Sequence, residues 1–322
     1  MSKKQIISII SVIVVVGGLG LLIGLNRQFL SDQILALTYQ PSNEMANIEN
    51  SLQLTSEGQR IFRASQPAIE DQEAFNEHCQ SHNVDVSVLG CYTNAHIYLY
   101  NVDKSELQGI KEATAAHELL HAAWARLSDN DKNDISAKLD AYYNEHKNEL
   151  GKEMGLYNEE QRLDELHSRV GTEGKNLPSD LSAYYAKYFY NQAHIVSYYD
   201  FYNGTFKALQ TQADKLLGEI DELKAKIESQ TNEYKTRSEA LSSQIAEFNQ
   251  CANTADCFSS QYEFNNRRNA LIDEQQALEQ LYQDIDHNIQ IYNQKVKTYN
   301  ANVFRTRNLQ NSINSNSQPP KV

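Results

Sequence analysis

The chain of 322 residues has little positive charge, with 29 lysine and arginine residues against 42 aspartate and glutamate residues and a formal net charge of −13. A protein that binds nucleic acid needs a basic stripe to neutralise phosphates, and this sequence contains none. We therefore exclude nucleic acid as a partner. The hydrophobic fraction of 40% suffices for one sizeable core but not for a uniformly globular chain, and the length predicts more than one domain.

Cysteine is also scarce, because the chain has only four. Cys79 and Cys91 flank a predicted strand, and Cys251 and Cys257 bracket a short polar loop. Neither pair has the Cys-x-x-Cys spacing of thiolate zinc sites, which disfavours that kind of metal site. Two local pairs instead predict two disulfides that form in an oxidising compartment, and four unrelated thiols are the weaker alternative.

One long hydrophobic run stands out at the N-terminus. Ile6 to Leu25 is uncharged and has the length needed to cross a bilayer. Lys3 and Lys4 precede it, and it lacks the small-residue cleavage site of a signal peptide. Residues 1–25 are therefore predicted to be a single-pass transmembrane anchor of the cell membrane, with the N-terminus cytoplasmic and the bulk of the chain extracytoplasmic.

The residues best suited to chemistry lie in the segment His117-Glu118-Leu119-Leu120-His121, within an apolar-periodic run from about 104 to 127 that predicts a helix. Two histidines at i and i+4 share a helix face, so both imidazoles can bind one metal ion. Glu118 projects beside that face, where it can act on a water molecule without ligating the metal. The motif therefore predicts a Zn²⁺ site with Glu118 as the catalytic base.

The residues before the motif support this interpretation. Residues 84–100 are rich in β-branched and aromatic side chains and predict a strand, a turn near Thr93 and Asn94, and a second strand that ends at Val102. Asp103 or Ser105 can cap the following helix, and Ser128 marks its end. A strand that leads into an HExxH helix resembles the zinc peptidases of the thermolysin group, the glutamate zincins.

The resemblance covers about 59–202 and implies a zincin-like metallopeptidase domain over 59–205, mainly α with a small β-sheet. It implies hydrolysis of peptide bonds, with Glu118 taking a proton from water and passing it to the leaving amine. It also implies that the strand 95–100 offers its edge to an extended peptide or protein substrate. A Tyr or His from an aromatic-rich helix over 179–202, such as Tyr184 or His194, would stabilise the oxyanion, although such a run more often packs in a core.

The resemblance further implies a third metal ligand from a downstream helix, predicted over about 156–170 after another at 132–150. We choose Glu165 as this ligand. The family's Glu-x-x-x-Asp pattern is not matched, because Arg169 occupies the aspartate position. His167 would make a three-histidine site, and Glu173 is either a ligand or a partner of an imidazole. Three further residues of the same segment compete as ligands, and for most of the whole set the alternative is a solvated acidic helix face: Glu159, Glu160 and Asp164.

The remaining segments have their own patterns. Residues 26–58 are polar and predict a stalk, 60–65 a short strand or turn, and 69–82 a helix. Apolar residues recur at threes and fours in two arms over 206–307, which predicts an antiparallel coiled-coil hairpin with the second cysteine pair at its turn. The tail 308–322 is rich in Asn, Ser, Gln and Pro and predicts disorder.

These expectations leave two functions open. The first is a membrane-anchored, extracytoplasmic zinc peptidase, with amidase action on cell-wall peptide crosslinks as a variant that no sequence feature separates from proteolysis. The second is a cell-envelope coiled-coil scaffold or interaction protein whose zincin-like domain is inactive. Glu118 discriminates between them, because a purely structural zinc site has no use for a base beside the metal.

Overall fold

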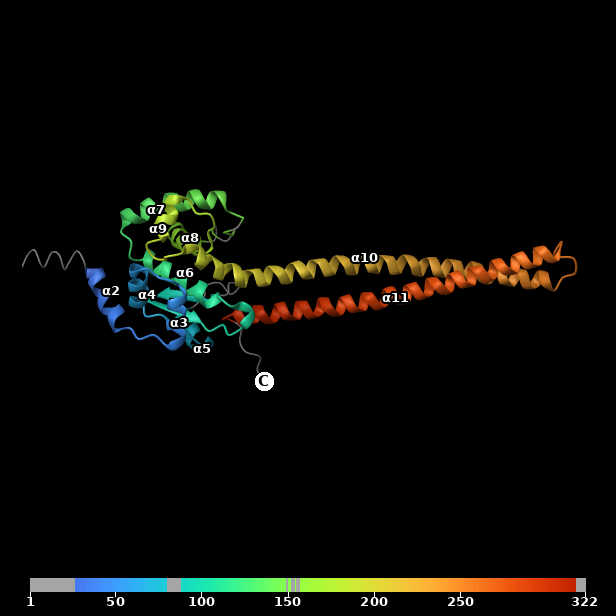
Figure 1. Ribbon diagram of the computed structural model, residues 1–322, viewed down its shortest axis with the longest axis horizontal. Helices are drawn as coiled ribbons and strands as arrows, with labels where there is room; N and C mark the ends of the chain where they lie inside the picture. The colour runs from blue at the N-terminus through green and yellow to red at the C-terminus, as the bar shows by residue number, and fades with distance from the viewer. Residues whose placement is uncertain (1–26, 80–87, 149, 152–153, 155–156, 317–322) are drawn as a thin grey trace, which may run out of the picture. The chain divides into compact units, whose positions relative to one another are not determined.

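The computed structural model describes residues 27–79, 88–148, 150–151, 154 and 157–316 (Figure 1). The chain divides into two compact units, Met1–Thr205 with Leu309–Val322, and Phe206–Asn308. The described residues are mainly helical and include one small sheet, as predicted. No helix among them is both long and apolar enough to cross a bilayer. The predicted anchor, 1–25, lies outside the described residues.

The first unit begins with three helices, α2 (Arg27–Thr38), α3 (Asn43–Ser51) and α4 (Ser56–Ala64). The side chains of Ser42 and Thr55 cap α3 and α4 by accepting hydrogen bonds from backbone N–H groups. One apolar residue of α3, Met45, is 1% exposed and belongs to the core. The predicted stalk over 26–58 is therefore wrong. Its polar composition concealed short amphipathic helices. Of the segment predicted as a strand or turn, 60–64 lies in α4 and Ser65 is the residue that ends this helix.

The sheet has three strands, β1 (Ala68–Glu70), β2 (Gly90–Thr93) and β3 (His96–Tyr100), in the order β1-β3-β2. β3 is parallel to β1 and antiparallel to β2. The predicted turn between β2 and β3 is confirmed at Asn94 and Ala95, whose φ angles are 49° and 63°. Because β3 is hydrogen-bonded on both sides, the predicted free edge at 95–100 is wrong, and β2 lies at one edge of the sheet that the described residues form.

The helix predicted over 69–82 begins later than expected. β1 occupies its first residues, and α5 (Gln72–His78) follows with Asp71 as its cap. The first part of the predicted strand, 84–87, lies outside the described residues. A disulfide joins Cys79 to Cys91 and thereby links the end of α5 to β2. The first predicted pair of cysteines is thus confirmed.

The motif helix, α6 (Ile110–Trp124), follows a short 3-10 turn at Ser105–Leu107, so it starts later than the predicted 104. α7 (Asp129–Glu145) starts at the Ser128 cap, and α8 (Glu159–Glu173) starts at the Asn158 cap. These two helices occupy most of the segments predicted as helical.

The helix predicted over 179–202 is interrupted, because α9 (Ser179–Tyr185) and α10 (Gln192–Ala252) are separate. Between them, the Tyr188 carbonyl accepts a hydrogen bond from the Thr55 N–H, and the Tyr190 N–H donates to the Gln53 carbonyl. This pairing with the segment before α4 replaces helical hydrogen bonds and ends α9.

The second unit consists of α10 from Phe206 onward and α11 (Gln261–Ile313) as far as Asn308. Lys295 pairs with Glu219 and Arg237 pairs with Glu274, so residues later in α11 contact residues earlier in α10. The two helices are therefore antiparallel, and Figure 1 shows them side by side. Apolar residues from both helices are buried along the contact: Ile220, Leu241, Leu278 and Ile285.

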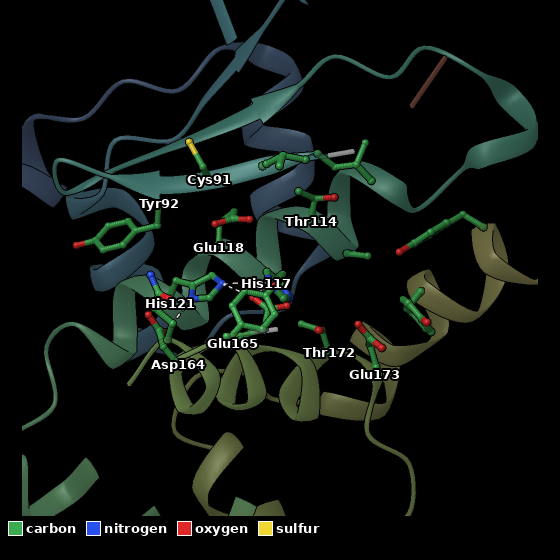
Figure 2. A pocket seen from close by; sticks show the side chains of 18 residues that line it. Cys91, Tyr92, Thr114, His117, Glu118, His121, Asp164, Glu165, Thr172 and Glu173 are labelled. Carbon is green, nitrogen blue, oxygen red and sulfur yellow. Dashed lines mark hydrogen bonds and ion pairs between the residues drawn. The ribbon is translucent and has the colours of Figure 1, made fainter. Parts of the chain in front are cut away.

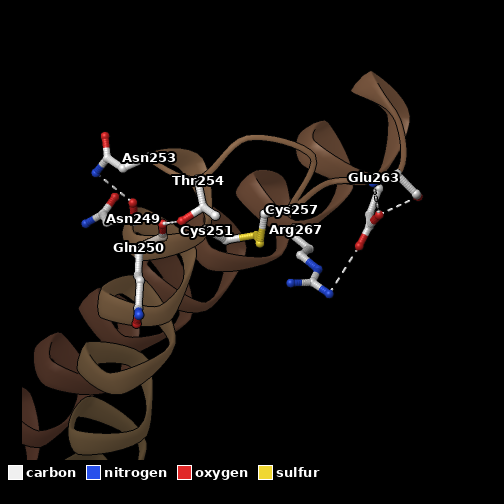
Figure 3. The surroundings of a disulfide bond; sticks show 9 residues. Asn249, Gln250, Cys251, Asn253, Thr254, Cys257, Glu263 and Arg267 are labelled. Atoms are coloured by element: carbon white, nitrogen blue, oxygen red, sulfur yellow. Dashed lines mark hydrogen bonds and ion pairs between the residues drawn. A yellow bond between two sulfur atoms is a disulfide. The ribbon is translucent and has the colours of Figure 1, made fainter.

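The hairpin turn carries the second predicted disulfide, between Cys251 and Cys257 (Figure 3). The rings of Phe248, Phe258 and Phe264 pack against one another beside it, with centroids 5.1–5.4 Å apart. A disulfide and three aromatic rings thus close the end of the hairpin.

The tail predicted as disordered is partly ordered. α11 continues to Ile313, and Ser315 is 1% exposed. The Ser315 carbonyl accepts hydrogen bonds from the side chains of Gln72 and Asn76, and its hydroxyl donates to the Val88 carbonyl. These contacts hold Ser315 against other residues of the first unit, so the prediction is wrong up to residue 316. Residues 317–322 lie outside the described residues.

Candidate metal centre

α6 and α8 cross at very close range. A Cβ atom at Gly171 of α8 would lie 2.3 Å from Leu120 Cδ1 of α6 and 2.6 Å from Tyr185 Cε1. A side chain at this position would therefore require Leu120 and Tyr185 to shift, and glycine fits the packing as it stands. The crossing brings one face of α8, with Asp164 and Glu165, against the histidines of α6 (Figure 2).

Three side chains converge at this crossing. His117 Nε2 and His121 Nε2 are 3.1 Å apart, and Glu165 Oε2 lies 3.7 Å and 3.5 Å from them, respectively. Ligand atoms about 2.0–2.1 Å from a tetrahedral Zn²⁺ ion are separated by about 3.3 Å from one another. The three predicted ligand residues thus have the donor types and the spacing that zinc takes.

Asp164 orients one of the imidazoles. Its Oδ1 accepts a hydrogen bond from His121 Nδ1 at 2.7 Å, which leaves Nε2 of the same ring directed toward Glu165. Carboxylates in this position fix the ring and the tautomer of a metal-binding histidine. The sequence offers Asp164 as a candidate ligand and does not predict its contact with His121. The sequence carries one signal for this contact. Asp164 is next to Glu165, and because neighbouring helix residues project about 100° apart, both can lie on the side that faces α6.

The electrostatics favour a cation between these groups. Burial by itself raises the pKa of Glu165. The charge of His117 and the hydrogen bonds from both imidazoles outweigh burial and hold this pKa well below its usual range. Burial by itself lowers the pKa of His121. The hydrogen bonds to Asp164 and Glu165 and the charges of nearby carboxylates together outweigh burial and raise this pKa well above its ordinary value. Two carboxylates therefore create a negative environment around the imidazole nitrogens.

The two alternative ligands are not brought to the histidines. His167 is 0% exposed, its Nε2 lies 2.9 Å from the Tyr184 hydroxyl, and its ring packs against Trp124. Burial lowers the pKa of His167 to about 3, so it is a neutral core residue. Glu173 forms an ion pair with Arg169, the residue that replaces the family's aspartate, at 3.0 Å.

Glu118 lies beside the centre in a cleft of about 590 Å³ (Figure 2). It is 5% exposed, and burial raises its pKa against the opposing charges of His121 and His117. β2 lies directly against it, because a Cβ atom at Gly90 would be 2.8 Å from Glu118 Cγ and 2.5 Å from Thr114 Cγ2. A buried carboxyl group with a raised pKa is well suited to accept and return a proton.

The walls of the cleft come from distant parts of the first unit. Residues 88–92, at and before β2, line it together with α8, and Tyr199 and Tyr202 of α10 line it as well. The oxyanion candidates Tyr184 and His194 do not line it. Tyr184 bonds to His167 in the core, and His194 Nε2 lies 3.2 Å from the Ser51 carbonyl. Tyr184 belongs to α9, whereas Tyr199 and Tyr202 belong to α10. The sequence did not predict the break between these two helices.

No protein-family model, no curated protein and no solved structure matches this chain. The resemblance to zinc peptidases therefore depends on the five-residue motif and on the side chains that the fold gathers around it.

Proposed function

We propose that the chain is a zinc-dependent peptidase that hydrolyses peptide bonds. The observation that carries the proposal is the convergence of His117, His121 and Glu165 beside Glu118, in a cleft bordered by the edge strand β2. Two imidazoles and one carboxylate are the ligand set of catalytic zinc sites that keep a position open for substrate or water.

The residues of the chain have distinct roles in this reaction. His117, His121 and Glu165 hold the ion, and Asp164 keeps His121 in its orientation. Zinc, when bound, supplies a Lewis acid that acidifies water and polarises a carbonyl group. Glu118 accepts a proton from the attacking water at a carboxylate oxygen and returns it to the amine that leaves.

The edge strand β2 offers a binding mode for the substrate. It pairs with β3 on one side and borders the cleft with Gly90 and Tyr92 on the other. An extended peptide can add to such an edge through main-chain hydrogen bonds, which requires little of its sequence. The proposed substrates are therefore extended polypeptide segments.

We further propose that the protein acts outside the cytoplasm, held by its N-terminal apolar run in the cell membrane. The uncharged stretch Ile6–Leu25 supports the anchor. Two disulfides support the location, because disulfides persist in oxidising compartments.

The proposal is tested with the full-length protein purified in detergent, loaded with zinc and incubated with a peptide library. Glu118→Gln removes the base and leaves the ligands in place, and we expect cleavage to fall about 100- to 10,000-fold. Glu112→Gln is the matched control, because it changes a glutamate of α6 outside the cleft lining. Equal cleavage by the wild type and Glu118→Gln would contradict the proposal.

A second candidate is a cell-envelope scaffold in which the zincin-like domain is inactive. It is supported by the second unit, 206–308, which forms a helical hairpin and contributes no residue to the cleft lining. This alternative predicts zinc in the wild type without cleavage of any peptide in the library, and equal behaviour of Glu118→Gln.

A further inference from the structure

One charged side chain of α2 is buried and points into the first unit. Asp32 is 1% exposed and is held between two arginines, with Arg60 Nη1 at 2.6 Å and Arg126 Nε at 2.9 Å from Oδ2. Gln28 of α2 adds a hydrogen bond to Oδ1 at 3.0 Å. Arg60 belongs to α4, and Arg126 follows the motif helix α6, so this ion-pair network fixes the side of α2 that faces the unit.

The opposite side of α2 is apolar. Leu30, Ile34 and Leu37 are 41%, 64% and 82% exposed, and their i, i+4, i+7 spacing places them in one stripe. We call these three residues the α2 stripe. A helix that faces water has the reverse pattern, with apolar residues inward and charged residues outward. The described part of the chain leaves the α2 stripe uncovered, which is unfavourable in water.

The position of α2 in the sequence indicates what covers the stripe. α2 begins at Arg27, two residues after the apolar run Ile6–Leu25 ends. Two residues span at most about 7 Å, so the first residue of α2 lies within that distance of the end of the run. A helix that lies in a bilayer interface places its apolar side about 5–10 Å into the boundary between headgroups and acyl chains.

We propose that α2 lies along the phospholipid bilayer on its extracytoplasmic side, with the α2 stripe inserted at the boundary between headgroups and acyl chains. This inference rests on the membrane anchor of the proposed function. α2 thus attaches the first unit to the membrane surface through a second, lateral contact.

The same network connects this contact to the cleft. Arg126 bonds to Asp32 of α2 and, through Nη1, to the Tyr92 hydroxyl at 3.1 Å. Tyr92 belongs to the edge strand β2 and lines the cleft. Two hydrogen-bonded steps therefore separate the bilayer-facing helix from the substrate strand, which assigns polypeptides at the membrane surface as the substrate class.

The test places a fluorescent probe on the stripe of the full-length protein in vesicles of phosphatidylcholine and phosphatidylglycerol. All four native cysteines are paired, so an introduced cysteine is the sole thiol available for labelling. The probe is attached at Ile34→Cys or, as a control, at Asn130→Cys, an exposed position on α7. Lipids with a nitroxide in the upper acyl chain serve as the quencher.

We expect the nitroxide lipids to remove most of the fluorescence at position 34 and little at position 130. With the probe at Leu30→Cys, the changes Ile34→Gln and Leu37→Gln should abolish the quenching, whereas Thr38→Gln, beside the stripe, should preserve it. These side chains are exposed, so the replacements leave the packing of the unit intact.

Three results would overturn the inference. The first is equal quenching at positions 34 and 130 in protein that floats with the vesicles. The second is protection of position 34 from aqueous iodide without quenching by the lipids, which would show that a second copy or another protein segment covers the stripe. The third is protein that does not float with the vesicles. The measurement uses neither zinc nor cleavage, so the Glu118→Gln variant should give the same quenching and a failed peptidase assay would leave the result unaffected.

Discussion

Glu165 and His167 lie two residues apart on α8, yet one faces the imidazoles of α6 and the other is a neutral core residue. Residues two apart on a helix project about 200° from each other. Glu165 and His167 therefore cannot both reach the imidazoles, and the His167 ring packs against Trp124 at the end of α6 instead. Asp164 lies on the cleft side and contacts His121. Residues of one acidic segment thus have different surroundings: Glu165 faces both imidazoles, Asp164 contacts His121, and His167 is buried.

Replacing Asp164 with alanine is predicted to lower zinc affinity about 10- to 100-fold, because His121 loses the carboxylate that orients it. Glu159→Ala is the control on the same helix, since Glu159 is an exposed carboxylate paired with Arg162. Competition with a chromophoric chelator measures both affinities. Equal affinities in the two variants would show that Asp164 has no positioning role.

His167 is predicted to make folding stability depend on pH. Its pKa is lowered to about 3 in the folded chain and is about 6.5 in an unfolded chain. At any pH between these two values, His167 is therefore protonated in the unfolded state and neutral in the folded state. Stability is therefore lost as the pH falls below about 6.5, by about 2 kcal/mol at pH 5 from this residue.

Urea titrations at pH 8 and pH 5, with a chelator present to remove any metal, measure this loss. His167→Gln cannot titrate at this position, and its stability should fall less between the two pH values. If the variant and the wild type lost the same amount, a buried neutral His167 would not be the source.

The packing of α8 against α6 at Gly171 positions the residues of the candidate centre. Gly171→Ala would push the side chains of Leu120 and Tyr185 from their places, and we predict a loss of about 1–3 kcal/mol of unfolding free energy together with weaker zinc binding. Gly204→Ala is the control, because a Cβ atom there meets nothing within 4 Å. It should raise stability by up to about 1 kcal/mol. Chemical denaturation measures both, and a neutral Gly171→Ala would contradict the close crossing.

The elements that the sequence predicted best are those with a strong local pattern. The hairpin has heptads along two arms, and the turn between β2 and β3 is flanked by two runs of β-branched and aromatic residues. The sequence could not show that α3 packs its few apolar residues into the core, that β1 pairs with β3, or that backbone pairing with 53–55 ends α9. Each of these depends on contacts between residues far apart in the chain.

The candidate site shows the same difference between features with a local sequence pattern and features that depend on contacts between distant residues. The face shared by His117 and His121 is local and was readable from the spacing of the motif. Which residue of α8 meets that face depends on how two helices cross, and the sequence alone left Glu165, His167 and Glu173 open. The edge strand was assigned to 95–100 because the pairing of β1 with β3 carries no local signal.

At the scale of the whole molecule, the chain is two units, each with its own disulfide. Replacing Cys251 and Cys257 with alanine is predicted to destabilise the hairpin unit by about 2 kcal/mol, since the disulfide closes a short loop. Zinc binding should not change, because every residue of the centre belongs to the other unit. Circular dichroism during denaturation and a zinc titration measure the two effects.

Replacing Cys79 and Cys91 with alanine gives the comparison with the hairpin disulfide. It lies in the unit with the centre and links α5 to β2, whose residues border the cleft. This replacement should weaken both stability and peptide cleavage. Identical effects of the two double replacements would contradict the division of the chain into a unit with the site and a unit without it.

The zinc content of the full-length protein decides whether His117, His121 and Glu165 form a metal centre. It is measured by atomic emission after zinc loading and dialysis, in the wild type, His121→Ala and His167→Gln. We expect one zinc per chain in the wild type and in His167→Gln, and none in His121→Ala. A wild type without zinc, or a His121→Ala variant that retains it, would contradict the assignment of His117, His121 and Glu165 as a metal centre.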